Sequence, residues 1–190
     1  YEPSISGMVY AAQPNSYRCE FGGETPDECA VLCAQSIEDL ILFHGPETVA
    51  ALIAEPVSAS SMAAVPGSPY WPMIRDICDR YGVLLIADEV ITGFGRTGQM
   101  FAVEHWDIVP DLMTVAKGIT SSYLPFAVSI ATNRVAEVFA GEKNVFRQAL
   151  TFGGHPVCAS AALTNIEIIE SEGLVENSAK MGAYFLDKLK

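Results

Sequence analysis

The chain has 190 residues, of which 50% are hydrophobic, and a formal net charge of −12. This length and apolar content exclude a disordered or fibrous protein, because the chain can bury a core of its own. The negative charge argues against a nucleic acid or an anionic membrane as partner, and it favours a small-molecule partner. The sequence has no apolar run that would span a bilayer and no signal-peptide pattern, so we expect a globular protein in the cytoplasm.

The first helix is predicted by a capping box and by helical spacing of apolar residues. Thr25 suits the N-cap, Pro26 the first helical position and Glu28 the third. Apolar residues then recur at helical spacing until Gly45-Pro46 ends the pattern. These signals predict an amphipathic helix over residues 26–43.

The next segment reads as strand, helix and strand. Residues 50–54 (AALIA) are continuously apolar, and a helix that begins at Ser68-Pro69 and ends at Gly82 precedes a second apolar run, VLLIA. Uninterrupted apolar strands that flank a helix are typical of a parallel sheet covered on both faces. The sequence therefore predicts an α/β fold with a right-handed crossover.

Three ionisable residues follow predicted strands. Glu55 follows AALIA, Asp88 lies in VLLIADEV (83–90), and Lys117 lies in DLMTVAKG (111–118). The carboxyl ends of parallel strands share one edge of a sheet, where ligands of such folds bind. Charged side chains are seldom buried without a partner. Taken singly, each residue suits a structural role as well as a functional one.

The sequence indicates neither a metal site nor a disulfide framework. The five cysteines are an odd number without CxxC spacing. Cys29 and Cys33 lie one helical turn apart, but no histidine or further cysteine is near them in sequence, so buried thiols are favoured over a metal site. The three histidines show no ligand spacing either.

Three longer motifs resemble the class III, or omega-type, pyridoxal 5'-phosphate (PLP)-dependent aminotransferases. They are IADEVITGFGRTG (86–98), PDLMTVAKGI (110–119) and TFGGHPVCASAAL (151–163), in the family's order and approximate spacing. The resemblance covers the chain from about Leu52 onward. It implies the type I PLP-dependent transferase fold, in which a large α/β domain binds the cofactor and a smaller domain closes on the substrate. It also implies a homodimer with active sites at the subunit interface.

Family chains are longer than this one, so we expect a partial chain. Residues 1–172 would form part of the PLP-binding large domain, with a mostly parallel sheet and helices on both faces. Residues 173–190 would begin a helix that leads to a small domain absent from this sequence.

The resemblance assigns roles to individual residues. Lys117 matches the lysine that holds PLP as an internal aldimine and then moves a proton, and Asp88 matches the carboxylate partner of the pyridinium nitrogen. Val90 would pack against one face of the ring, with a plain core valine as the alternative. Thr151 would reach the phosphate of the neighbouring subunit's cofactor, with a ligand-free glycine turn as the alternative. Glu55 would lie near the substrate, and a structural role remains equally open.

Ile91 and the loop that follows it narrow the resemblance to one branch of the family and exclude a P-loop. Members that act on ornithine carry a glutamine where this chain has Ile91, so the omega-amino-acid–pyruvate branch is the closer relative. The loop GFGRTG (93–98) lacks the lysine and hydroxyl of a phosphate-binding P-loop. We expect it to be a shaped loop in which Arg96 pairs with a carboxylate.

The predicted function is an aminotransferase that moves an amino group from an omega-amino acid, amine or diamine to a 2-oxo acid, with pyruvate as the expected acceptor. A same-fold PLP aminomutase, racemase or decarboxylase remains an alternative, because each uses the same lysine. A non-catalytic truncated relative is an alternative of another class. A nicotinamide dehydrogenase is disfavoured, since no GxGxxG follows the first strand.

Overall fold

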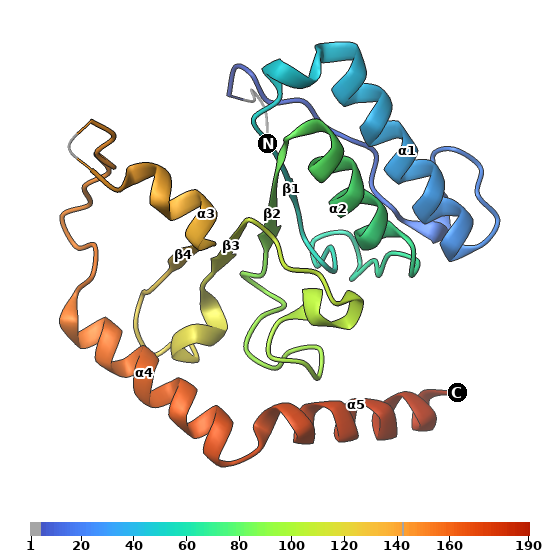
Figure 1. The fold of residues 1–190 in the computed structure, drawn as a ribbon. Coiled ribbons are helices and arrows are strands. Elements are labelled where there is room, and N and C mark those ends of the chain that lie inside the picture. The colour runs from blue at the N-terminus through green and yellow to red at the C-terminus, as the bar shows by residue number, and fades with distance from the viewer. Residues whose placement is uncertain (1–4, 142) are drawn as a thin grey trace.

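The computed structural model describes residues 5–141 and 143–190. Its strands are β1 (Ala51–Ala54), β2 (Leu84–Asp88), β3 (Leu112–Val115) and β4 (Val128–Ala131). Its α-helices are α1 (Pro26–His44), α2 (Tyr70–Tyr81), α3 (Asn133–Ala136), α4 (Pro156–Ser171) and α5 (Leu174–Leu189), as Figure 1 shows. Short 3-10 helices are η1 (Ser16–Arg18), η2 (Pro46–Thr48), η3 (Ala102–Trp106), η4 (Lys117–Thr120) and η5 (Glu137–Phe139).

The four strands form one sheet in the order β1-β2-β3-β4. β1, β2 and β3 run parallel, whereas β4 pairs antiparallel with β3. The mostly parallel α/β sheet is therefore confirmed, and the antiparallel edge strand is an addition that the sequence did not predict. In the register between β2 and β3, Asp88 lies opposite Thr114.

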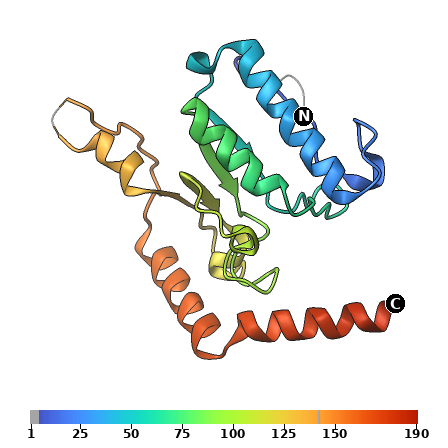
Figure 2. The same cartoon turned by 45° about the vertical axis from the view of Figure 1, so that its right-hand side comes forward.

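Helices α1 and α2 lie side by side against one face of the sheet (Figures 1 and 2). The predicted capping box is present, because Glu28 N donates to Thr25 Oγ1 at 3.1 Å and Thr25 N donates to Glu28 Oε2 at 3.2 Å. Helix α2 ends at Gly82, whose φ of 69° is left-handed and suits glycine. The core between helices and sheet is built on Trp71, Ile74 and Leu85, all fully buried.

Other parts of the described chain remain open to solvent. Ile53 of β1 is 51% exposed, so this strand is covered by helices on one face and bare on the other. Helix α5 has no buried residue, and α4 and α5 form a bent arm that runs below the rest of the chain in Figure 2. None of the helices within residues 5–141 and 143–190 has the length and apolar character needed to cross a membrane.

The cysteines are less scattered than their sequence spacing suggests. The sulfur atoms of Cys19, Cys29 and Cys33 lie within 4.8 Å of one another. The inference that Cys29 and Cys33 have no cysteine partner is therefore wrong. Spacing could not reveal this, because Cys19 precedes α1 and comes into contact only when the chain folds back onto the helix.

Candidate active site

Asp88 ends β2 at the carboxyl edge of the sheet, where its carboxylate is fixed by two neighbours. Val90 N donates to Asp88 Oδ1 at 3.1 Å, and Thr114 Oγ1 donates to the same oxygen at 3.2 Å. The parallel register places Thr114 directly opposite Asp88, which explains the second contact. Asp88 Oδ2 has no hydrogen-bonding partner among the residues that the structure describes. One carboxylate oxygen is therefore held by the protein and the other is available.

Lys117 follows β3 at the same edge and begins η4. Its side chain is exposed, and its φ of 40° lies in the left-handed region. A residue other than glycine in this region stores backbone strain, which is found at functional sites more often than elsewhere. Lys117 thus lies on a constrained turn directly after β3, whose last residue, Val115, is buried.

Gly118 lets the lysine turn approach the loop that follows β2. A Cβ atom at Gly118 would lie 3.1 Å from Cβ of Phe94 and 3.3 Å from the Gly93 carbonyl oxygen. A larger residue would push the two segments apart, so the glycine keeps the segments after β2 and β3 in contact.

Helix α4 fixes the other side of this turn through one residue, Asn165. Its Nδ2 donates to the carbonyl oxygens of Gly118 at 2.9 Å and Ile119 at 3.1 Å. Its Oδ1 accepts a hydrogen bond from Ser121 Oγ at 2.7 Å. The turn that carries Lys117 is therefore held by side-chain contacts as well as by its own backbone.

Glu89, next to Asp88, is fully buried and holds the loop after β2 in place. Its carboxylate accepts hydrogen bonds from Thr92 Oγ1 and, at 2.8 Å, from Val103 N. Sequence reasoning missed Glu89, Thr114 and Asn165. Only the acidic Glu89 inside an apolar run gave a local signal, whereas the other two acquire their roles through the register and the packing of α4.

The loop over residues 93–98 is a shaped loop, as expected, and its glycines admit α5. A Cβ atom at Gly98 would lie 2.9 Å from Cα of Ala179, and one at Gly95 would lie 3.3 Å from Val175 Cγ2. The expectation that Arg96 pairs with a carboxylate is wrong: Arg96 is exposed and forms no ion pair within the described parts of the chain. The glycines, rather than an arginine pair, shape this loop.

Glu55 follows β1, but its carboxylate is engaged locally. Glu55 Oε2 accepts a hydrogen bond from Ala59 N at 3.1 Å, and Oε1 accepts one from Ser58 Oγ at 3.4 Å. These contacts hold the turn that follows β1. Val90, by contrast, is half-buried beside Asp88 and touches its carboxylate through the backbone.

Thr151 lies apart from the strand ends of its own chain, in an exposed turn before α4. Gly154 in this turn has φ of 68°, and α4 then begins with Pro156 at its first position, as predicted. The structure thus brings Asp88, Val90 and Lys117 to one edge and places Thr151 on a separate, outward-facing turn.

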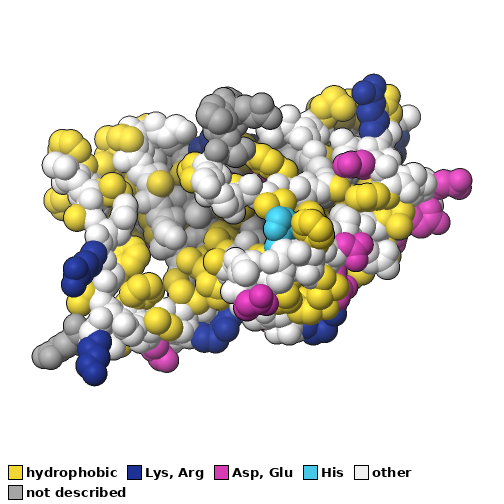
Figure 3. Space-filling view, turned by 90° about the horizontal axis from the view of Figure 1, so that it is seen from above, with side chains coloured by type: hydrophobic (Ala, Val, Ile, Leu, Met, Phe, Trp, Pro, Cys, Tyr) yellow, Lys and Arg dark blue, Asp and Glu magenta, His cyan; other side chains and the backbone are white. Residues whose placement is uncertain are grey.

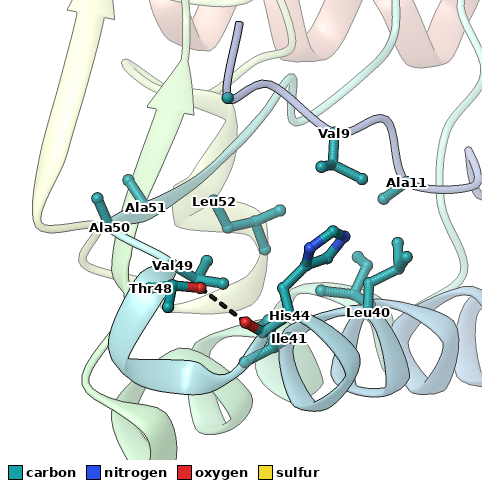
Figure 4. A pocket seen from close by; sticks show the side chains of 12 residues that line it. Val9, Ala11, Leu40, Ile41, His44, Thr48, Val49, Ala50, Ala51 and Leu52 are labelled. Atoms are coloured by element: carbon teal, nitrogen blue, oxygen red, sulfur yellow. Dashed lines mark hydrogen bonds between the residues drawn. The ribbon is translucent and has the colours of Figure 1, made fainter.

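Of two cavities, one lies away from this edge and the other borders the Lys117 turn, since Thr120 and Asn165 line it. One of about 550 Å³ lies between the N-terminal segment, α1 and β1, lined by mainly apolar side chains such as Val9, Ile41 and Leu52 (Figure 4). Another of about 730 Å³ lies between Tyr123 and α4. Neither is lined by Asp88, Lys117 or Thr151. The candidate site is accordingly an open surface at the strand ends in the described chain.

Comparisons with known proteins show the family to which the chain belongs. The family described as aminotransferase class III matches residues 1–190. Putrescine–pyruvate aminotransferase from Pseudomonas aeruginosa is 43% identical over 97% of this chain and 40% of its own length. Diaminobutyrate–2-oxoglutarate transaminase from Halomonas elongata is 44% identical over 100% of this chain and 42% of its own length.

A solved structure shares the fold. An amine transaminase from an uncultivated Pseudomonas species, in the PLP-bound internal aldimine form, matches with a TM-score of 0.94 and 38% identity over 100% of this chain and 43% of that chain. The chain therefore spans about two fifths of the length of the relatives it matches. The match over the whole chain and the identities near 40% show that it belongs to the class III aminotransferases, a family of PLP-dependent enzymes.

Proposed function

We propose that this chain supplies the catalytic lysine and the ring-binding carboxylate of a PLP-dependent aminotransferase. The amino donor would be an omega-amino acid, an amine or a diamine, and the acceptor a 2-oxo acid. The observation that carries the proposal is the pair Asp88 and Lys117 on neighbouring strand ends, each with its functional group available.

The residues at this edge fit the cofactor in three respects. Asp88 Oδ2 is uncommitted and would accept a hydrogen bond from the protonated pyridine nitrogen. Lys117 carries an exposed primary amine that would bind the cofactor aldehyde. Val90 is half-buried next to Asp88 and would offer an apolar surface to the ring. When bound, PLP supplies a ring that accepts the electrons released at the donor carbon.

The protein's own groups would then perform distinct tasks. Asp88 would keep the ring nitrogen protonated, and Thr114 would keep Asp88 in position. Lys117 Nζ would take the proton from the amine-bearing carbon of the donor. Gly118 and Asn165 would hold the turn that aims this amine, through the contacts described above. The local hydrogen bonds of Glu55 favour a structural role, so we assign it no contact with the substrate.

We further propose a homodimer in which Thr151 contributes to the partner's cofactor site. Its turn is exposed, and large apolar side chains nearby, among them Phe146, Leu150 and Phe152, are also exposed. Figure 3 shows hydrophobic side chains over α3 and the segment after it, at the left end of that view. A surface of this kind favours burial against another protein surface. The five free thiols suit a cytoplasmic location, which we also propose.

The acceptor is proposed to be pyruvate. Ile91 stands where ornithine-acting relatives have a glutamine, and one relative above is named for pyruvate. The Halomonas relative is named for 2-oxoglutarate, which makes this oxo acid the competing acceptor. A panel of taurine, β-alanine, putrescine and aromatic amines with each acceptor tests it. Consumption of 2-oxoglutarate in preference to pyruvate would contradict the branch assignment.

The decisive test of the catalytic lysine is reductive trapping. The purified protein is incubated with PLP, reduced with borohydride and digested, and the modified peptide is identified by mass spectrometry. We expect the cofactor on Lys117 and none in Lys117→Ala, with Lys143→Ala as an unaffected control. Attachment at another lysine would overturn the assignment. An aminomutase, racemase or decarboxylase would trap the cofactor equally but would not consume the oxo-acid acceptor.

A further inference from the structure

Three cysteines converge where the chain that precedes α1 packs against this helix. Cys29 and Cys33 lie one turn apart on α1, both fully buried, and their sulfur atoms are 4.0 Å apart. Cys19, which is half-buried, follows η1 and adds a third sulfur within 4.8 Å of the other two. All three are free thiols.

The backbone is shaped to bring Cys19 to the helix. The turn after Cys19 closes with Gly22 N donating to Cys19 O at 3.2 Å, and Gly22 has φ of 77°. A Cβ atom at Gly23 would lie 2.6 Å from the backbone nitrogen of Cys29. Only glycine permits this approach, so the turn and the helix are in direct backbone contact where the sulfur atoms meet.

The three thiols differ in pKa and in burial because their surroundings differ. A hydrogen bond from the Cys29 thiol lowers the pKa of Cys19, and the N–H groups of Phe21, Gly23 and Gly22 add to this. Burial raises the pKa of Cys29 and of Cys33. Cys33 Sγ donates to the Gln13 carbonyl oxygen at 3.5 Å. Cys19 is therefore the accessible thiol of the three, and Cys29 and Cys33 lie buried behind it.

We propose that Cys19, Cys29 and Cys33 form a three-thiolate site for one thiophilic metal ion of the Zn²⁺ class. Three Zn–S bonds of about 2.3 Å in a tetrahedral arrangement require sulfur separations of about 3.8 Å. The observed separations therefore need to contract by about 1 Å or less. Sulfur donors alone select zinc or a softer ion over magnesium or calcium.

The site has three protein ligands and one open position. Each thiol releases its proton as the metal–sulfur bond forms. Cys19, the only one of the three that is not fully buried, would provide the entry path, and water would complete the coordination. A metal bound here would join the turn at residues 19–23 to α1. It would not touch Asp88 or Lys117, which lie at the sheet edge.

Titration with Co²⁺ as a spectroscopic probe for Zn²⁺ tests the site. The reduced, metal-free protein should bind one equivalent of Co²⁺ with thiolate charge-transfer absorption, and Zn²⁺ should displace it. Cys19→Ser should remove the absorption and weaken Zn²⁺ binding by about 100-fold or more. Cys158→Ser is the matched control, because Cys158 is also half-buried and lies on α4. We expect it to bind as the unmodified protein does.

Alkylation gives a second measurement that needs no variant. Zn²⁺ should protect Cys19 from a maleimide and leave Cys158 reactive, as read by peptide mass spectrometry. Equal alkylation of Cys19 with and without Zn²⁺ would overturn the proposal. So would Co²⁺ binding without charge-transfer absorption, or absorption that persists in Cys19→Ser.

Discussion

At the scale of single residues, the two oxygens of the Asp88 carboxylate differ: the protein binds one, and the other can bind a ligand. Oδ1 accepts hydrogen bonds from Val90 N and Thr114 Oγ1. Oδ2 remains available within the described chain. Asp88→Asn keeps the size of the side chain but removes its negative charge, so the variant separates charge from shape.

We predict that Asp88→Asn folds normally but loses activity. A hydrogen bond between charged groups contributes about 1.5 to 3 kcal/mol, which corresponds to a fall in kcat of roughly 10- to 150-fold. Steady-state kinetics with a saturating donor measure this, and circular dichroism checks the fold. An Asn variant with unaltered kcat would show that the ring nitrogen is bound elsewhere.

Thr114 is predicted to act through Asp88 as a positioning residue. Thr114→Val removes the donor to Asp88 Oδ1 and should lower kcat by about 5- to 10-fold, since a hydrogen bond contributes about 1 kcal/mol. Cofactor absorbance should shift with it. Thr132→Val is the matched control, because Thr132 Oγ1 is buried with no hydrogen-bonding partner within the described chain. Equal kinetic effects of the two substitutions would refute a specific role for Thr114.

At the scale of elements, Asp111 joins the start of β3 to three other segments. Its carboxylate is nearly buried and accepts from Leu85 N at 2.9 Å, from Arg75 at 3.0 Å and from Arg134. Burial acts to raise the pKa of Asp111, but the Leu85 N–H and the guanidinium groups of Arg134 and Arg75 together lower it. The Asp111 carboxylate and its three partners therefore form an electrostatic junction that links β2, β3, α2 and α3.

This junction predicts an acid-sensitive stability. Because the folded pKa of Asp111 is lower than the unfolded value, its contribution is present above about pH 4 and is lost as pH falls through the folded pKa. Asp111→Asn should lower the free energy of unfolding by about 1 to 3 kcal/mol at pH 7 and flatten its decline below pH 4. Denaturant titration at several pH values measures both effects.

Asp79→Asn is the control for this prediction. Asp79 pairs with the same Arg75 at 2.7 Å but is exposed, so its loss should change the free energy of unfolding by less than about 1 kcal/mol. A larger loss in Asp79→Asn than in Asp111→Asn would contradict the assignment of the junction to Asp111.

The same elements show what the sequence could predict. Helix α1 and the strand ends after β2 and β3 follow from local signals: a capping box, helical spacing and apolar runs that end in a charged residue. Strand β4 could not be predicted from the sequence. Its four residues are too few to show a periodic pattern, and the strand depends on pairing with β3. Thr114, Asn165 and the Cys19 contact depend on residues distant in sequence, which only the folded chain brings together.

At the scale of the whole molecule, several exposed apolar side chains lie between β4 and α4, among them Phe139, Phe146, Leu150 and Phe152. Phe146 is 65% exposed and packs edge-to-face on Phe139, with ring centroids 5.3 Å apart. Thr151 lies a few residues further along the chain. If this surface joins two subunits, dimer formation and completion of the cofactor site are one event.

Phe146→Asp is predicted to weaken the dimer. Burial of a charge in an apolar interface should raise the dimer dissociation constant by about 30-fold or more, equivalent to about 2 kcal/mol. Phe43→Asp, at the end of α1 and 84% exposed, is the matched control and should leave the dimer intact. Sedimentation equilibrium measures the constants.

Because Thr151 would serve the partner's cofactor, the affinity for PLP should fall when the protein is diluted and the dimer dissociates. A Phe146→Asp protein that stays dimeric, or PLP affinity independent of protein concentration, would place the subunit interface on another surface.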